Sequence, residues 1–200
     1  MTTPIPEEIT QAPVDEPAED KPNAFWRFLL DLLETLVLSV LLYLAINAVS
    51  ARVRVDGFSM RPTLEDGQYV LVNRLAYRFG EAERGDIVVF HSPVAATQLD
   101  LIKRVVGLPG ETVNVRNGVV SVDDVVLTEP YIADSPRYNG EWVVPEGHLF
   151  VLGDNRNDSS DSHSWGLLPI SNVIGKAILI YWPPPAWELI DHVPPVAAAP

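Results

Sequence analysis

The segment TVNVRNGVVSV, residues 112–122, decides the fold class of this chain. Valines alternate with polar residues on both sides of Asn117-Gly118, and this two-residue period is typical of strands with one buried face. Asn-Gly is the dipeptide that most readily takes the positive φ angles of a type I′ turn. The segment therefore predicts an antiparallel β-hairpin.

From Arg52 to Trp182 the sequence contains further short runs of β-branched residues, separated by Gly, Pro, Asn and Asp. Short runs separated by turn residues are typical of an all-β domain. The predicted strands are VRV (53–55), YVLVN (69–73), DIVVF (86–90), LIKRVVG (101–107), TVNVR (112–116), VVSV (119–122), WVV (142–144), HLFVL (148–152) and VIGKAILIYW (173–182). We expect a mainly β fold, an antiparallel β-sheet domain at 51–183 with a small inserted subdomain at about 111–147.

The end of the chain is rich in proline. Residues 184–200 read PPAWELIDHVPPVAAAP. Proline has no amide hydrogen to donate to a neighbouring strand. We expect this C-terminal tail not to continue a sheet.

The segment before the β domain, FWRFLLDLLETLVLSVLLYLAINAV (25–49), is apolar over most of its length. At about 1.5 Å per helical residue, the part from Leu29 to Val49 is long enough to cross a bilayer. We expect a transmembrane helix at 25–50 after a disordered, acidic, proline-rich tail at 1–24. An amphipathic surface helix and a cleaved signal peptide are the alternatives. Flanking lysines and arginines do not decide the orientation.

Composition argues against several classes of function. The net charge of −13 speaks against nucleic acid as a partner, because phosphate binding needs clustered Lys and Arg. The chain has no cysteine, which leaves out disulfides, thiolate catalysis and cysteine-bound metal. Its four histidines, at positions 91, 148, 163 and 192, do not have a metal-ligand spacing such as HExxH. We expect neither a metal nor another cofactor.

Three segments carry residues suited to catalysis. Ser59 follows a predicted strand in VDGFSMRPTLEDGQYVLVN, where Gly57 would let the backbone approach a substrate closely. Lys103 interrupts the apolar strand LIKRVVG, where lost hydration would lower its pKa and make it a base for a serine hydroxyl. Taken alone, the first segment fits better a serine in an ordinary turn, and the second a lysine facing water. The third, VLGDNRNDSSDSHSWGLLPI (151–170), fits a polar loop or a calcium loop, although without EF-hand spacing.

The ordered segments GFSMRPTL, RGDIVVF, IKRVVGLPGE and GDNRNDSSDSHSWG, behind one membrane span, closely resemble bacterial type I signal peptidase (leader peptidase). The resemblance covers roughly residues 30–182. It implies a signal-peptidase-like antiparallel β-sheet domain with one N-terminal transmembrane helix. It also implies a membrane-bound serine endopeptidase that removes N-terminal signal peptides from exported preproteins, cutting after small-x-small motifs with a Ser/Lys dyad.

The resemblance assigns roles to individual residues. Ser59 matches the nucleophile and Lys103 the general base, and the Ser59 backbone amide matches an oxyanion donor. The implied supporting residues are Met60 beside the nucleophile, Ser159 as the hydrogen-bond partner that orients Lys103, Arg104 and Asp161 as an ion pair, and a frame of Asp154, Asn155 and Arg156.

Three positions depart from the family pattern. Gly57 stands where some members have a serine hydroxyl, so the second oxyanion donor is expected to be a backbone amide or water. His163 stands where the family often has arginine, which makes this support of Asp161 charged only at lower pH. The order Asn157-Asp158 inverts the commoner Asp-Asn.

The resemblance also implies substrate, partners and location. By family position, shallow apolar pockets for small side chains are lined by Val53, Val55, Leu64, Val89 and Ile102, with a purely core role as the alternative. The implied partners are signal peptides of secreted preproteins and membrane lipid, with a functional link to the export machinery. The implied location is the plasma membrane, single-pass, with a cytoplasmic N-terminus and an extracytoplasmic catalytic domain whose Ser59 lies near the bilayer.

Two other functions compete with this interpretation. A self-cleaving Ser/Lys repressor peptidase would share the dyad, but it should carry a basic helix-turn-helix domain in place of a membrane span. A catalytically silent, membrane-tethered β domain that binds exported peptides would keep the pockets without needing both Ser59 and Lys103.

Overall fold

The computed structural model describes residues 24–94, 99–192 and 196–197 of the 200-residue chain, so nearly all of the expected N-terminal tail lies outside the described residues. The chain divides into two compact units, Met1–Tyr43 and Leu44–Pro200, and the boundary falls within the first helix. The division into domains expected from the sequence stays a prediction.

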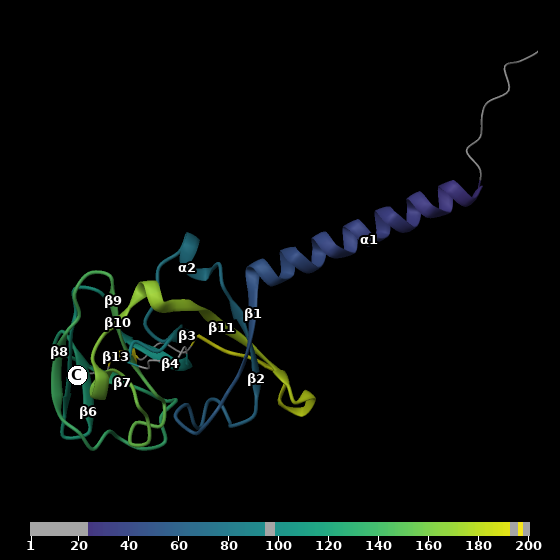
Figure 1. The fold of residues 1–200 in the computed structure, drawn as a ribbon. Coiled ribbons are helices and arrows are strands. Elements are labelled where there is room, and N and C mark those ends of the chain that lie inside the picture. Colours follow the sequence, from purple (N-terminus) through teal and green to yellow (C-terminus); the bar gives the residue numbers. More distant parts are fainter. Residues whose placement is uncertain (1–23, 95–98, 193–195, 198–200) are drawn as a thin grey trace, which may run out of the picture. The chain divides into compact units, whose positions relative to one another are not determined.

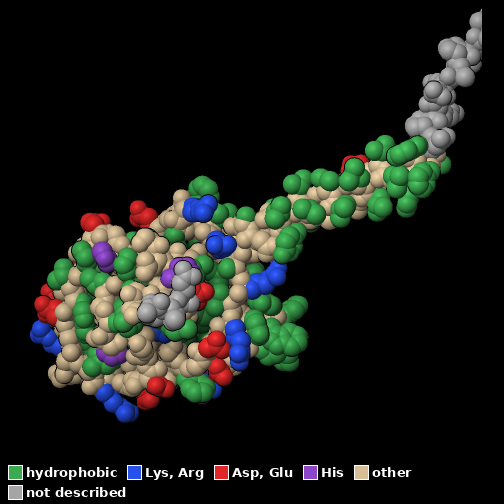
Figure 2. Space-filling model, viewed as in Figure 1, with side chains coloured by type: hydrophobic (Ala, Val, Ile, Leu, Met, Phe, Trp, Pro, Cys, Tyr) green, Lys and Arg blue, Asp and Glu red, His purple; other side chains and the backbone are tan. Residues whose placement is uncertain are grey.

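The N-terminal helix, α1 (Ala24–Val49), carries apolar side chains around its surface (Figure 2). None of its residues is buried, and among the described residues it is the one helix long and apolar enough to cross a membrane. Two hydroxyls within it are satisfied internally, because Thr35 donates to the Asp31 carbonyl at 2.8 Å and Ser39 to the Thr35 carbonyl at 2.7 Å. A helix of this kind suits a lipid environment, where polar groups need partners within the protein.

The first sheet is antiparallel, with the strand order β1-β2-β11-β3-β4-β9-β10, and β12 pairs with β11. Its strands are β1 (Ser50–Arg54), β2 (Tyr69–Asn73), β3 (Ile87–His91), β4 (Asp100–Gly107), β9 (His148–Leu152), β10 (Leu168–Pro169), β11 (Val173–Trp182) and β12 (Glu188–Leu189). Short helices occupy the connections: α2 (Ala76–Phe79), α3 (Ser162–Trp165), η1 (Ile170–Asn172) and η2 (Pro184–Ala186).

The second sheet contains the hairpin predicted from residues 112–122. Its order is β13-β7-β6-β5-β8, and Figure 1 shows β6, β7, β8 and β13 grouped together. The strands are β5 (Thr112–Arg116), β6 (Val119–Val122), β7 (Val125–Thr128), β8 (Gly140–Val143) and β13 (Val196–Ala197). Asn117 and Gly118 have φ angles of 52° and 80°, which confirms the predicted I′-type turn.

One expectation about strands was wrong. The C-terminal tail does pair, because Glu188–Leu189 joins β11 and Val196–Ala197 joins β7. The prolines at 183–185 form the turn before β12, and pairing resumes at residues that keep their amide hydrogens, as in the bond from Ile190 N to Ile178 O at 3.0 Å. Sequence reasoning also missed β7, which follows a tight turn at Asp123-Asp124.

Strand β4 is an interior strand of the first sheet, between β3 and β9. Its residues from Ile102 to Gly107 are all buried, so the strand is covered on both faces. Ile102 belongs to a buried cluster with Val89, whereas Val105 belongs to another cluster with Val88. Any polar side chain in the middle of β4 is therefore taken out of water, and this applies to Lys103 and Arg104.

The packing of the second sheet leads to a prediction about stability. Val113 is fully buried, whereas Val119 on the paired strand is 44% exposed. We expect Val113→Ala to lower the free energy of unfolding by about 2 kcal/mol, because it removes two buried methyl groups and leaves a cavity. The matched change Val119→Ala should cost less than about 0.5 kcal/mol. Denaturant unfolding of the purified chain in detergent, followed by tryptophan fluorescence, measures both, and equal losses would contradict this packing.

Candidate active site

Ser59 lies on the loop between β1 and β2, which is fastened at several points. Gly57, with a φ angle of 93°, takes a conformation that other residues rarely adopt, and its amide donates to Asp66 Oδ1 at 2.8 Å. Met60 and Leu64 are buried in the cluster that also contains Ile102, and Leu64 N donates to Met60 O at 2.9 Å. These contacts hold the loop that carries Ser59 in place, and Met60 lies beside Ser59 as expected.

Ser59 and Lys103 are in direct contact. Lys103 Nζ donates to Ser59 Oγ at 2.7 Å and to the Ile102 carbonyl at 2.9 Å. The two residues are 44 positions apart in the chain and are brought together by β4 and the β1–β2 loop. A nucleophile and a base within hydrogen-bond reach form the arrangement that serine catalysis needs.

Burial changes the acid–base behaviour of Lys103. The residue is 3% exposed, and the loss of hydration lowers its pKa to about 8, although Asp161 and Asp154 oppose this shift. Among the described residues, no carboxylate lies within ion-pair distance of its ammonium group. Near neutral pH the amine therefore loses its proton far more readily than a lysine in water.

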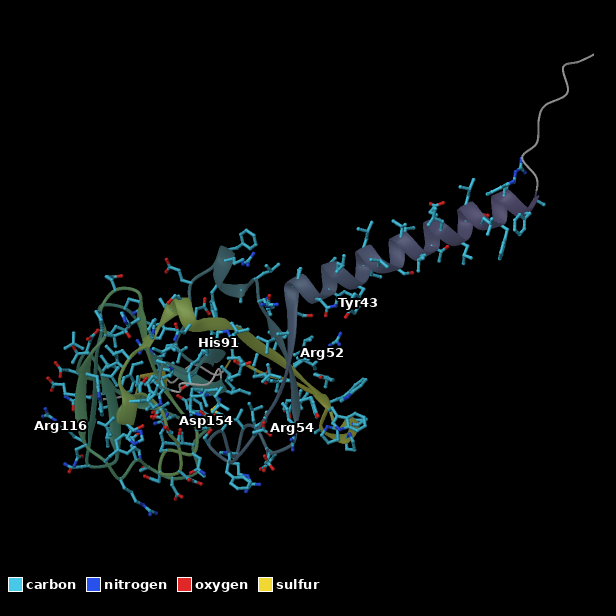
Figure 3. The ribbon with its side chains drawn as sticks, in the orientation of Figure 1. Tyr43, Arg52, Arg54, His91, Arg116 and Asp154 are labelled. Atoms are coloured by element: carbon cyan, nitrogen blue, oxygen red, sulfur yellow. The ribbon has the colours of Figure 1, made fainter. Side chains whose placement is uncertain are left out.

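Arg104 is held by Asp154 and not by Asp161, so the expected Arg104–Asp161 ion pair is wrong. Arg104 Nε and Nη2 donate to the two oxygens of Asp154 at 2.8 and 2.7 Å, and both side chains are almost fully buried. Consecutive strand residues point to opposite faces, so Arg104 points away from the dyad side of β4. Figure 3 shows Asp154 among the side chains inside the β domain, whereas Arg116 points outward.

Two residues that sequence reasoning missed contact the Arg104–Asp154 pair. Thr63 Oγ1 donates to Asp154 Oδ2 at 2.5 Å, and the ring of Tyr131 lies 3.9 Å from the Arg104 guanidinium. Thr63 is part of the segment GFSMRPTL, but nothing in the sequence pattern indicates its partner.

Asp161 has a partner of a different kind. It is fully buried, and its Oδ1 lies 2.6 Å from His163 Nδ1 while its Oδ2 accepts a hydrogen bond from Gly153 N at 2.9 Å. The same carboxylate accepts from His163 N at the start of α3. The support of Asp161 by His163 that the sequence indicated is therefore present.

Ser159 does not make the hydrogen bond expected of it. Its Oγ is buried without a hydrogen-bond partner among the described residues, and Lys103 donates elsewhere. Ser159 lies against Gly153, where a Cβ atom would collide with Ser159 Oγ and with the carbonyl oxygen of Ser59. The glycine at 153 thus lets the Ser59 and Ser159 segments meet.

One of the predicted frame residues, Asn155, is hydrogen-bonded to the Ser59 loop. Asn155 N donates to Ser59 O at 3.0 Å, and Asn155 Nδ2 donates to Phe58 O at 3.2 Å. Arg156 is buried and forms a two-pronged pair with Glu129, with nitrogen–oxygen distances of 2.5 and 2.6 Å. Glu129, from the end of the inserted strands, is a partner that the sequence did not indicate.

The five predicted pocket residues share one cluster, in which Val53 is partly buried. Val55 and Ile102 are 4% and 7% exposed, whereas Leu64 and Val89 have no exposed surface. Leu64 and Val89 are therefore core residues, which favours the purely core role given above as the alternative to pocket lining. A substrate-binding role for the set stays a prediction.

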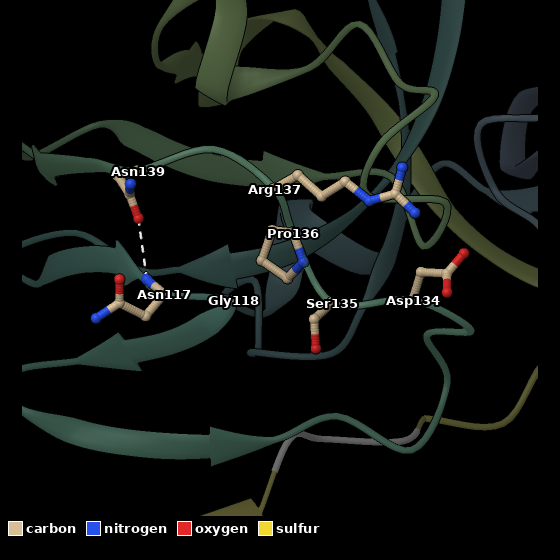
Figure 4. A pocket seen from close by; sticks show the side chains of 7 residues that line it. All are labelled: Asn117, Gly118, Asp134, Ser135, Pro136, Arg137 and Asn139. Carbon is tan, nitrogen blue, oxygen red and sulfur yellow. Dashed lines mark hydrogen bonds between the residues drawn. The ribbon is translucent and has the colours of Figure 1, made fainter.

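Two other features of the β domain resemble sites. Glu83, Asp86 and His192 hold possible metal ligands within 4.8 Å of one another, but Lys176 Nζ lies 2.5 Å from Asp86 Oδ1 and supplies a cation there. A polar hollow, shown in Figure 4, is lined by residues of two loops, and Asn117 N donates to Asn139 Oδ1 within it at 2.9 Å. It contains none of the predicted site residues, so the geometry of Ser59 and Lys103 is the stronger indication of a catalytic centre.

Comparison with known proteins gives a consistent result. The family described as signal peptidase, peptidase S26, matches residues 29–182. A probable signal peptidase I-1 of Synechocystis sp. is 42% identical over 170 residues, covering 81% of this chain and 87% of that protein. A signal peptidase I of Leptolyngbya laminosa is 42% identical over 181 residues, covering 86% and 89%. Thylakoidal processing peptidase 1 of Arabidopsis thaliana is 38% identical over 148 residues, covering 69% of this chain and 44% of that protein.

The family match extends over most of the chain, from α1 to the end of β11, and so includes the loop of Ser59, the strand of Lys103 and the segment from Gly153 to His163. With the Synechocystis and Leptolyngbya relatives matched over 87% and 89% of their length, this chain belongs to the signal peptidase I family, peptidase S26, the serine endopeptidases that remove signal peptides from preproteins.

Proposed function

We propose that this chain cleaves signal peptides from exported preproteins after small-x-small motifs, with Ser59 as nucleophile and Lys103 as general base. The observation that carries this proposal is the 2.7 Å contact between Lys103 Nζ and Ser59 Oγ inside a buried setting. Burial favours the neutral amine, which is the form that can accept a proton.

The reaction follows from this contact. Ser59 Oγ attacks the scissile carbonyl carbon while its proton passes to Lys103 Nζ; the carbon–nitrogen bond then breaks and the leaving amine takes that proton. A water molecule, deprotonated by Lys103, hydrolyses the resulting ester on Ser59. The Ser59 amide has no hydrogen-bond partner among the described residues, which leaves it free to donate to the oxyanion. The Gly57 amide is already bound to Asp66, so the second donor is another amide or water.

Substrate and location complete the proposal. Val53, Val55 and Ile102 lie in the cluster that also contains Met60, and their small exposed areas suit shallow pockets for small side chains. We place α1 in the plasma membrane, where it contacts lipid. The N-terminus is then cytoplasmic and the β domain extracytoplasmic. The enzyme is linked in function to the export machinery, which supplies its substrates. Only a short stretch separates Val49 from Ser59, which suits a substrate still held in the bilayer.

The dyad is tested by substitution. We expect Ser59→Ala and Lys103→Met each to lower kcat/KM on a preprotein whose signal ends in Ala-x-Ala by at least about a thousandfold, because each removes a reacting group. Ser171→Ala, a change at an exposed serine, is the matched control and should keep full activity. Cleavage by either dyad variant at the wild-type rate would rule out the proposed roles, and no cleavage by the wild type would favour a binding module.

The pH dependence tests the base. The active form carries neutral Lys103, and its pKa of about 8 means that activity should rise with pH through that value. At two pH units below the midpoint, about one per cent of the amine is neutral and kcat/KM should fall accordingly, by about a hundredfold. Initial rates of preprotein cleavage measured from acidic to alkaline pH give the curve. A rate independent of pH, or a midpoint at the lysine value near 10.5, would exclude this base.

The orientation is tested with single cysteines, because the native chain has none. In intact cells, a membrane-impermeant maleimide should label Ser171→Cys in the β domain and should leave Thr10→Cys unlabelled until the membrane is opened. The reverse pattern would show that the β domain is cytoplasmic. Equal labelling of both positions in intact cells would contradict a single membrane crossing.

A further inference from the structure

The loop between β7 and β8 is bound by two consecutive residues of the segment that follows β9. Arg156 forms its buried ion pair with Glu129, at the start of this loop. The exposed Asn157 binds the backbone further along: its Oδ1 accepts from Arg137 N at 2.8 Å, and its Nδ2 donates to Ser135 O at 3.0 Å. The inserted strands are therefore joined to the segment after β9 at two points.

The contact at Asn157 uses both functions of its side-chain amide. Arg137 N can only donate and Ser135 O can only accept, so these two partners fix which way the amide points. An ionised aspartate has acceptors alone. At this position it would accept from Arg137 N but would hold an oxygen against the Ser135 carbonyl. The inverted order Asn157-Asp158 thus places at 157 the side chain that this loop can bind.

The loop that Asn157 binds is itself supported by the second sheet. Asn117 N, in the turn between β5 and β6, donates to Asn139 Oδ1 at 2.9 Å (Figure 4). The neighbouring Gly118 lies so close that a Cβ atom there would come within 3.2 Å of Ser135 Cβ. Asn157 is therefore attached to a part of the chain that a β-hairpin holds in place.

Asn157 lies inside a tight turn that leads to the nucleophile. Asp158 N donates to Asn155 O at 3.1 Å, which closes a four-residue turn with Asn157 at its third position. Asn155, the first residue of the turn, donates from its backbone N to Ser59 O at 3.0 Å and from its Nδ2 to Phe58 O at 3.2 Å. The position of this turn therefore affects the peptide groups on both sides of Ser59.

We propose that Asn157 is a positioning residue for the nucleophile: it holds the turn that begins at Asn155 against the β7–β8 loop. The turn in turn keeps the Ser59 carbonyl oriented, so that Ser59 Oγ stays 2.7 Å from Lys103 Nζ. This inference rests on the proposed roles of Ser59 and Lys103. It gives the inserted strands a part in catalysis, because they supply the fixed surface to which the turn is bound.

Two substitutions at Asn157 test the proposal through catalysis. Asn157→Ala removes both hydrogen bonds, whereas Asn157→Asp keeps the size of the side chain and sets two acceptors against each other. Each should lower kcat about tenfold and leave KM within about twofold, because a displaced nucleophile loses alignment for attack more than it loses substrate binding. The aspartate variant should lose at least as much as the alanine variant. Rates of preprotein cleavage in detergent, at a pH above the Lys103 midpoint, give both constants.

Asn139→Ala is the matched control. It removes an asparagine side chain from the same loop, and with it the hydrogen bond to Asn117 N, but it leaves both bonds of Asn157 in place. We expect wild-type kcat and KM for this variant. A loss of kcat equal to that of Asn157→Ala would show that any loosening of the loop lowers activity, and it would overturn the specific role of Asn157.

Amide hydrogen exchange tests the same step without a substrate. The reporter amides belong to Asn155, which donates to Ser59 O, and to Asn117, which donates to Asn139, so ¹⁵N-asparagine labelling observes both. Asn157→Ala should speed exchange at Asn155 about tenfold and leave Asn117 unchanged, because the turn opens locally while the hairpin stays closed. Asn139→Ala should speed exchange at Asn117 alone.

The outcomes separate this inference from the proposed function. Lower kcat in both Asn157 variants, with faster exchange at Asn155 and an unaffected Asn139→Ala, supports the positioning role. Wild-type kcat in Asn157→Asp would overturn it, and so would unchanged exchange at Asn155, even if the variants were less stable. Cleavage by Ser59→Ala at the wild-type rate would instead overturn the proposed nucleophile, whereas the exchange rates would still show whether Asn157 holds the turn.

Discussion

A lysine held out of water inside a β-sheet is the constraint on which the proposed active site depends. Lys103 sits on β4, which has neighbours on both sides and buried residues on both faces. An amine in such a place favours the neutral form, and its two hydrogen-bond partners are oxygens without charge, Ser59 Oγ and the Ile102 carbonyl. A serine peptidase with such a base needs no imidazole.

The charged side chains around Lys103 pair with one another and not with its amine. Arg104 pairs with Asp154, Arg156 with Glu129, and Asp161 lies against His163. Asp154 and Glu129 are thus each compensated by an arginine, and Asp161 has His163 as a close partner. Among the described residues, Lys103 has no counter-ion at contact distance. The same pairs hold the Gly153–Asn155 segment against the Ser59 loop. Stability and base strength therefore depend on the same contacts.

Much of this could be predicted from sequence, for identifiable physical reasons. Alternating valines and Asn117-Gly118 specify the β5–β6 hairpin locally, because turn geometry and strand period act over a few residues. Contacts between distant segments could not be derived in this way: Ser59 and Lys103 were joined through family resemblance, and the partner of Arg104 was assigned wrongly. Its true partner, Asp154, depends on which face of β4 each side chain takes. The strand at Glu188–Leu189 was missed because its proline-rich surroundings concealed two residues free to pair.

The protonation state of Lys103 is the central claim, and an NMR titration of its Cε signal in the substrate-free protein tests it without reference to any substrate. A midpoint near pH 8 is the result that this account requires. A midpoint close to 10.5, the value of a lysine in water, would contradict it, because the amine would then be charged when Ser59 needs a base.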